Sequence, residues 1–121
     1  MSRAPHPALA LAKARLDRLD WYPRPVRIEH VRLVHAAWLY RLPWFRRFDG
    51  YATHYAIFLR RAYRPGVDDD LVTHELCHVW QMQHRPLAMP LSYLRTGYDR
   101  SPYERQAREA ARRTQAKPGD S

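Results

Sequence analysis

The sequence predicts one small α+β domain, because segments with helical and with strand periodicity follow one another along it. Apolar residues recur at helical spacing near the start, a central segment alternates residue by residue, and two later segments carry helix-start signals. A chain of 121 residues can bury one hydrophobic core. We therefore expect a single domain over residues 1–121, with residues 1–7 and 117–121 disordered.

The first expected element is an amphipathic helix from Ala8 to Leu19, which ends before Pro23. The next segment, Val26 to Val34, has both strand-like and helix-like spacing. We predict a strand there, followed by an irregular connection through residues 42–45. Together with the strand described next, it would form a small β-sheet or hairpin.

Asp49-Gly50 indicates a turn, and the segment from Tyr51 to Leu59 then gives the clearest strand of the chain. Every second residue is expected on the same face of this strand: Tyr51, Thr53, Tyr55, Ile57 and Leu59.

The most informative segment is the HExxH pattern His74-Glu75-Leu76-Cys77-His78. Three aspartates at 68–70 suit the start of a helix, and Pro86 suits its end. Helix positions i and i+4 lie on one face, with Cβ atoms roughly 5–6 Å apart. His74 and His78 can therefore bind one metal ion, with Glu75 beside them. The pattern predicts a zinc (Zn²⁺) site in which Glu75 is the general base of a hydrolytic reaction.

A final helix is expected to begin at Ser101-Pro102-Tyr103-Glu104 and to run to about Gln115. Ser101 is a favourable N-cap, Pro102 suits the first helical position and Glu104 suits the third. Residues 87–94, mostly apolar, would connect the motif helix to it directly or through a short helix.

A catalytic zinc ion takes three protein ligands and a water, so HExxH needs a third ligand. Glu104 is the strongest candidate, because the chain between the two helices is long enough to return beside the motif. Two histidines and a glutamate are also a normal ligand set for zinc. Two other roles compete for Glu104: a capping box with Ser101 and a helical ion pair with Arg108.

His84 and Asp99 are weaker candidates for the third ligand. His84 has the spacing of the third histidine in HExxHxxGxxH proteins. Gln81 replaces the glycine whose turn brings that histidine back to the metal. On a continuous helix His84 would lie ~9 Å beyond His78 along the axis. Cys77 is expected to be a small buried residue and not a ligand.

Composition limits the compartment and the partners. A single cysteine excludes an intramolecular disulfide. The sequence has no stretch approaching ~18 apolar residues, and its N-terminal apolar run is too short for a signal peptide. We expect a cytoplasmic protein with no transmembrane span and no membrane partner. The net charge of +9 would suit nucleic acid, but no nucleic-acid-binding motif accompanies it, and we favour a solvated basic surface.

The segment from Tyr51 to Ala110 resembles zincin metallopeptidases of the gluzincin type, especially compact bacterial zinc-peptidase domains. The HExxH pattern and the later Ser101-Pro102-Tyr103-Glu104 carry this resemblance. It implies a zincin-like fold in which His74, His78 and Glu104 bind zinc and Glu75 is the general base. Many gluzincins also have an acidic residue about four positions after the ligand glutamate, which orients a histidine. This chain departs from that pattern, since it has Arg108 there and Glu109 next.

The expected function is hydrolysis of peptide bonds in a peptide or protein substrate. The predicted strand from Tyr51 to Leu59, if it is an edge, could hold the substrate by strand addition. Tyr98, Tyr103 and His54 are candidate oxyanion donors that the sequence does not rank. The alternative is a non-catalytic zinc-binding interaction module, with nucleic acid as a partner of its basic surface.

Overall fold

A computed structural model describes residues 6–46, 48–89, 91–92, 97 and 101–115. The structure combines helices with a three-stranded sheet, which confirms the predicted α+β class. The described elements are, in chain order, α1 (Pro7–Leu16), β1 (Arg32–His35), the 3₁₀ turns η1 (Ala37–Arg41) and η2 (Pro43–Phe45), β2 (Gly50–Ala52), β3 (Ala56–Leu59), α2 (Asp69–His84) and α4 (Pro102–Arg113).

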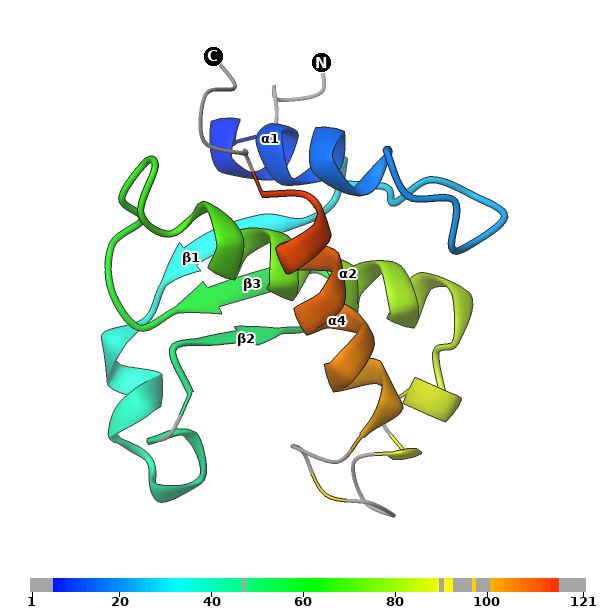
Figure 1. The fold of residues 1–121 in the computed structure, drawn as a ribbon. Coiled ribbons are helices and arrows are strands. Elements are labelled where there is room, and N and C mark those ends of the chain that lie inside the picture. The colour runs from blue at the N-terminus through cyan, green and yellow to red at the C-terminus, as the bar shows by residue number, and fades with distance from the viewer. Residues whose placement is uncertain (1–5, 47, 90, 93–96, 98–100, 116–121) are drawn as a thin grey trace.

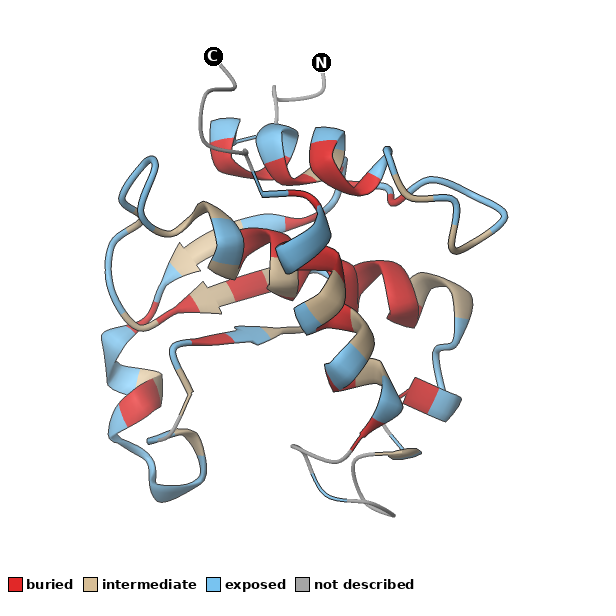
Figure 2. Cartoon of the chain, in the orientation of Figure 1, coloured by how far each residue is buried: buried red, intermediate tan, exposed pale blue. Residues whose placement is uncertain are grey.

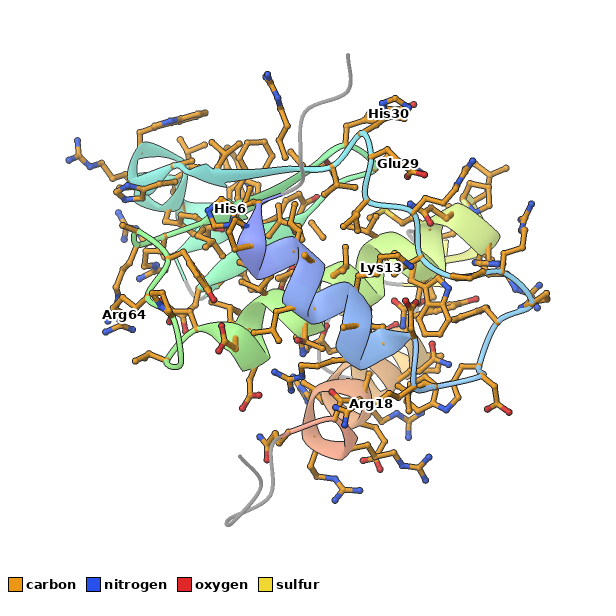
Figure 3. The ribbon with its side chains drawn as sticks, turned by 90° about the horizontal axis from the view of Figure 1, so that it is seen from above. His6, Lys13, Arg18, Glu29, His30 and Arg64 are labelled. Carbon is orange, nitrogen blue, oxygen red and sulfur yellow. The ribbon has the colours of Figure 1, made fainter. Side chains whose placement is uncertain are left out.

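Helix α2 is the central element, since it packs against α1, α4, β2 and β3 (Figure 1). The sheet has the order β1-β3-β2, with β1 parallel and β2 antiparallel to β3. Strand β2 is therefore an edge, and it is the strand with most contact to α2. Seen from above, α1 crosses over α2, and Arg64 marks the loop that leads into α2 (Figure 3).

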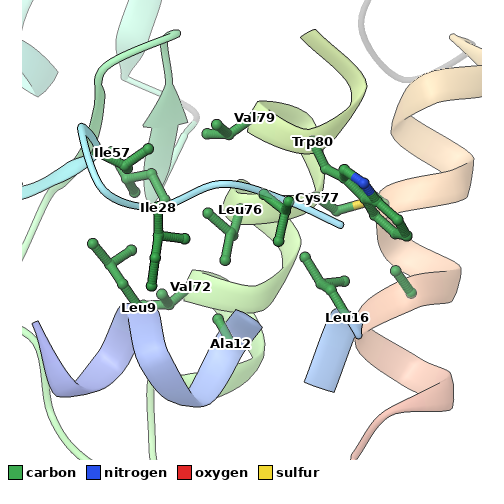
Figure 4. Close-up of a cluster of buried hydrophobic side chains, with 14 of the residues drawn as sticks. Leu9, Ala12, Leu16, Ile28, Ile57, Val72, Leu76, Cys77, Val79 and Trp80 are labelled. Carbon is green, nitrogen blue, oxygen red and sulfur yellow. The ribbon is translucent and has the colours of Figure 1, made fainter. Parts of the chain in front are cut away.

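The main core lies between α1, α2 and the sheet (Figures 2 and 4). Leu9, Ala12 and Leu16 are three or four residues apart on α1, so they form one apolar stripe that faces α2. Val72 and Leu76, four residues apart on α2, meet that stripe. Buried residues lie on most sides of α2, because the helix is surrounded by α1, α4, β2 and β3.

The predicted continuous strand from Tyr51 to Leu59 is wrong, because the chain makes a hairpin there. Strands β2 and β3 pair with Tyr51 opposite Phe58. Thr53 forms the turn: its backbone N–H donates to the carbonyl of Ala56 at 2.8 Å, and its hydroxyl accepts from the backbone N–H of Ala56 at 3.0 Å. This local hydrogen bonding of a threonine side chain competes with extension of the strand.

The predicted strand from Val26 to Val34 is correct only at its end, where β1 begins at Arg32. The preceding residues satisfy their backbone groups with side chains of α2. The Trp80 indole donates to the carbonyl of Arg24 at 2.8 Å, and the Gln83 amide bonds both the N–H and the carbonyl of Arg27. A segment whose polar backbone groups are satisfied in this way has no need of a strand partner.

Both outer helices end before the predicted residues. Helix α1 stops at Leu16 and not at Leu19, with Asp17 as its C-cap. Helix α4 begins as predicted after Ser101 and ends at Arg113, two residues before Gln115. The disorder expected for residues 1–7 is wrong at His6, which caps α1, and at Pro7, the first residue of that helix. Residues 1–5 and 117–121 lie outside the described residues, and so do parts of the connection 87–94. In the described part of the chain, no helix is long and apolar enough to cross a membrane.

We predict that Leu9→Ala lowers the free energy of unfolding by about 2–5 kcal/mol, because it leaves a cavity between α1 and α2. Leu9 is 1% exposed, whereas Leu11 on the same helix is 45% exposed. The matched variant Leu11→Ala should change stability by about 0.5 kcal/mol or less. Urea unfolding followed by circular dichroism measures both; equal destabilisation would contradict this description of the α1–α2 core.

Candidate metal centre

Helix α2 brings His74, Glu75 and His78 together, as the HExxH spacing predicts. One ligand atom from each residue lies within 4.8 Å of the other two. The two imidazole rings are 4.9 Å apart between centroids and nearly perpendicular. Glu75 and His78 are buried, while His74 keeps a partly exposed side chain. The cluster therefore sits inside the protein, with His74 on its more open side.

Helix α4 places Glu104 directly against both histidines. One carboxylate oxygen, Oε1, is 2.8 Å from Nε2 of His74, and the other, Oε2, is 2.9 Å from Nε2 of His78. The Glu104 side chain is only 2% exposed. A carboxylate so thoroughly buried needs positive charge or donated hydrogen bonds next to it. The arrangement therefore places both Nε2 atoms against one carboxylate, each beside a different oxygen.

These three groups fit a zinc ion by their chemistry. Tetrahedral ligands 2.0–2.1 Å from zinc are about 3.3 Å from one another. The Nε2 atoms of His74 and His78 lie 2.8 and 2.9 Å from different oxygens of the Glu104 carboxylate, which is shorter than that spacing, so the groups would have to move apart to admit an ion. Two imidazoles and one carboxylate also match the ligand set of hydrolytic zinc sites.

Of the two other roles expected for Glu104, the structure has the ion pair with Arg108 but not the capping box with Ser101. Ser101 caps α4 with its hydroxyl, which accepts from the N–H of Tyr103 at 3.2 Å. The Glu104 carboxylate points to the histidines and therefore does not complete a capping box with Ser101. The ion pair with Arg108 is present, at 3.3 Å between Nε and Oε1, although the Arg108 side chain is largely exposed. Arg108 thus approaches the same carboxylate from the solvent side.

A buried hydrogen-bond network fixes the ring of His78. Its Nδ1 lies 2.8 Å from Oε1 of Gln81. The Gln81 amide nitrogen donates to the carbonyl of Tyr103 at 2.8 Å and to Oε1 of Gln106 at 2.9 Å. Because both of those partners only accept, the Gln81 oxygen must face His78, and Nδ1 must carry the proton. Nε2 of His78 is then directed at Glu104 and can serve as a ligand atom.

Glu75 is a buried carboxylate next to the edge strand. A Cβ atom placed on Gly50 would lie 3.1 Å from Cγ and 3.3 Å from the carboxylate carbon of Glu75. Among the described residues, no group hydrogen-bonds the Glu75 carboxylate. Burial raises the pKa of Glu75 above its ordinary value, and the nearby His78 and His74 partly oppose this rise. A carboxylate with a raised pKa is a better proton acceptor near neutral pH.

The charges of His78 and Glu104 depend on each other. Burial alone would lower the pKa of His78, but the hydrogen bond with Glu104 and the charge of Glu75 outweigh it, and the pKa is raised. Burial likewise opposes the charged form of Glu104, yet the contacts with His74 and His78 hold its pKa well below the ordinary range. In the metal-free protein this carboxylate is therefore ionised, with the two imidazoles as its hydrogen-bond partners.

The structure places His84 away from the cluster. Its ring stacks on Tyr22 at 4.8 Å between centroids, and its Nε2 accepts from the N–H of Arg24. The helix continues through Gln81, so the turn needed to bring His84 back is absent from α2. Cys77 is fully buried in the apolar core as expected, and burial raises the pKa of its thiol. Asp99, the other candidate ligand, lies outside the described residues.

None of the three candidate oxyanion donors is placed at the cluster by a described contact. Tyr98 lies outside the described residues. The ring of Tyr103 packs against the core, and its carbonyl accepts from Gln81. His54 is exposed on the hairpin turn and lines a cavity beside Met82.

Sequence analysis missed two residues of this site. In the sequence pattern Gln81 only replaces a glycine, although its position three residues after His78 puts it on the same helix face. Asp49-Gly50 predicts a turn, but Gly50 is the first residue of β2 and lies against Glu75. The spacing could have indicated Gln81, whereas the proximity of Gly50 depends on the packing of the sheet.

Comparison of the chain with known protein families, curated proteins and solved structures found no match.

We predict that Gln81→Leu weakens zinc binding by roughly 10–100-fold, because His78 loses the partner that fixes its ring and its tautomer. Gln83→Leu is the matched control, since Gln83 lies on the same helix but bonds the backbone of Arg27. Competition with a chromophoric chelator gives the zinc affinity of each folded variant. Wild-type affinity in Gln81→Leu would show that the hydrogen bond does not support the site.

Proposed function

We propose that this protein is a zinc-dependent metallopeptidase. The observation that carries the proposal is the position of the buried Glu104 carboxylate, within 2.9 Å of Nε2 of both His74 and His78. Three residues from two helices thus lie together with the ligand set of hydrolytic zinc enzymes. Glu75 lies beside them without a hydrogen-bond partner among the described residues, which suits a proton-transfer role.

In the proposed reaction, Glu75, Gln81 and Gly50 would have separate roles beside the metal. When bound, zinc supplies a Lewis acid that lowers the pKa of its water toward ~7 and polarises the carbonyl of the scissile peptide. Glu75 accepts the proton of the attacking water and passes it to the leaving amine. Gln81 holds His78 in the required tautomer, through the hydrogen bond of 2.8 Å to Nδ1. Gly50 leaves space for the Glu75 side chain against β2.

Strand β2 is the part of the sheet best placed to hold an extended substrate. It is one of the two edge strands, and its first residue, Gly50, lies against Glu75. An edge strand offers unpaired backbone N–H and carbonyl groups, to which a peptide can add as a further strand. A peptide bound along β2 would run past the carboxylate that acts as the base. This geometry supports a peptide or protein substrate.

A second candidate function is zinc binding without catalysis, in an interaction module. The burial of the cluster favours it, since Glu75, His78 and Glu104 are all buried and His74 has only a partly exposed side chain. A structural zinc ion does not need Glu75, so the two functions differ in the consequence of changing that residue. Association with nucleic acid rests on the +9 net charge alone and is not favoured.

We predict that the purified protein binds about one zinc ion per chain and that Glu104→Gln binds it at least tenfold more weakly. Glu109→Gln is the matched control, because Glu109 lies on the same helix but pairs with Arg112 and Arg113 at the surface. Elemental analysis after dialysis against zinc gives the stoichiometry. Equal zinc content in both variants, or none in the wild type after reconstitution, would contradict the proposed ligand set.

We predict that Glu75→Gln retains zinc and loses hydrolysis by roughly 10²–10⁴-fold, because the amide cannot accept the proton of the attacking water. Cleavage of a peptide library, read by mass spectrometry, measures activity, and elemental analysis confirms the metal. A zinc-loaded wild-type protein that cleaves no member of the library would favour the non-catalytic module. Full activity in Glu75→Gln would remove Glu75 from the mechanism.

A further inference from the structure

The two 3₁₀ turns η1 and η2 expose an unusual set of side chains. Trp38 is 65% exposed and Trp44 is 74% exposed, and Leu42 between them is exposed as well. Arg41 and Arg46 are also exposed. We call these five residues, Trp38, Arg41, Leu42, Trp44 and Arg46, the aromatic–arginine patch. The turns form a corner of the molecule on the far side of the sheet from α1 (Figures 1 and 2).

The inner side of the turns is firmly attached to the protein. Tyr40 is buried, and its hydroxyl donates to the carbonyl of Phe58 in β3. The Arg60 guanidinium lies over the Tyr40 ring and donates to the carbonyls of Phe45 and Arg46. These contacts fix the backbone of both turns. The exposure of the patch is therefore a property of an ordered segment.

The geometry of a 3₁₀ helix separates the attached side from the patch. Side chains at positions i and i+3 of such a helix lie one above the other. Trp38 and Arg41 therefore share one face of η1, and the buried Tyr40 lies on another. Tyr40 and Phe45 face the protein and each other, with ring centroids 6.3 Å apart. In these two turns, the aromatic side chains that do not pack against the protein are those of Trp38 and Trp44.

The patch is basic as well as apolar. The sequence from Ala36 to Phe48 contains three arginines and no acidic residue. The first carboxylate beyond it, Asp49, lies 3.9 Å from Nε of Arg60 and is thus near a positive charge of its own. The whole chain has a net charge of +9. A partner for this surface must accept tryptophan and leucine side chains and carry negative charge.

We propose that the aromatic–arginine patch docks the protein on the surface of an anionic lipid bilayer. Tryptophan prefers the interface between lipid headgroups and hydrocarbon, where its ring is partly apolar and its N–H stays hydrated. Leu42 adds an aliphatic group that has no use in stacking on a nucleic-acid base. Arg41 and Arg46 add attraction to anionic headgroups, worth roughly a fivefold gain in affinity for each charge near the surface.

The patch leads along the chain into the edge strand β2. Phe45 packs against Tyr51 of β2, with ring centroids 5.1 Å apart. Docking would therefore hold β2 close to the bilayer. The earlier expectation of no membrane partner rested on the lack of a spanning segment, which does not bear on surface docking. Lipid binding itself does not depend on the proposed peptidase function, and removal of metal should leave it unchanged.

The test is co-sedimentation of the full chain with vesicles of phosphatidylcholine alone and of phosphatidylcholine containing about one third phosphatidylglycerol. We expect binding to the anionic vesicles, weakened by added salt. Arg41→Ala with Arg46→Ala should lower the affinity roughly 30-fold. Trp38→Ala with Trp44→Ala should lower it on the order of tenfold or more.

Matched controls use exposed residues outside the patch. Tyr55→Ala removes an exposed aromatic side chain from the hairpin turn, and Arg27→Ala with Arg105→Ala removes two exposed charges. Both controls should bind anionic vesicles with affinity within about threefold of the wild type. Circular dichroism of every variant confirms the fold.

Tryptophan fluorescence separates insertion from attraction by charge alone. Vesicles should shift the wild-type emission to the blue, and lipids brominated along their chains should quench it. In the variant lacking Trp38 and Trp44, the remaining Trp21 and Trp80 should show neither effect. Trp80 is fully buried in the core.

Three results would overturn the proposal. The first is no binding to either vesicle, or binding that the double tryptophan variant retains. The second is preferential binding of single-stranded nucleic acid with no vesicle binding, which would make the patch a base-stacking surface. The third is a dimer in sedimentation experiments that Trp38→Ala with Trp44→Ala dissociates, again with no vesicle binding, which would make the patch a contact between copies of the chain.

Discussion

The burial of the Glu104 carboxylate between two imidazoles is the interaction on which the other features depend. A carboxylate that is 2% exposed is stable only where positive charge or hydrogen-bond donors replace the water it has lost. His74 and His78 supply these groups from α2, and Arg108 adds a guanidinium from the solvent side. A protonated imidazole or a bound cation would neutralise this carboxylate.

This requirement also accounts for the arrangement of the helices. Helix α2 must be buried enough to keep water from the cluster, and it packs against two helices and two strands. Helix α4 must present its first turn to α2, because Glu104 lies in that turn. The Ser101 cap fixes where the helix begins. The polar groups that remain are satisfied within the interior, where Gln81 joins His78 to the backbone of Tyr103.

The sequence predicted what depends on local spacing. The helical i, i+4 relation placed His74 beside His78, and the Ser-Pro-x-Glu signal placed the start of α4. The predictions from the sequence were wrong where a residue's conformation depends on contacts with residues far away in the sequence. The chain before β1 is not extended in a strand because Trp80 and Gln83 satisfy its backbone, and the alternation from Tyr51 to Leu59 concealed a turn built by Thr53. The contact of Gly50 with Glu75 arises only when the sheet packs on α2.

Anomalous diffraction from zinc-loaded crystals, measured on either side of the zinc absorption edge, tests whether His74, His78 and Glu104 form one metal site. We expect one strong peak per chain, about 2.0–2.2 Å from Nε2 of His74, Nε2 of His78 and a carboxylate oxygen of Glu104, with Arg108 not among the ligands. A zinc-loaded crystal with no peak at this point, or with its zinc held by other residues, would contradict the assignment of these three residues as one metal site.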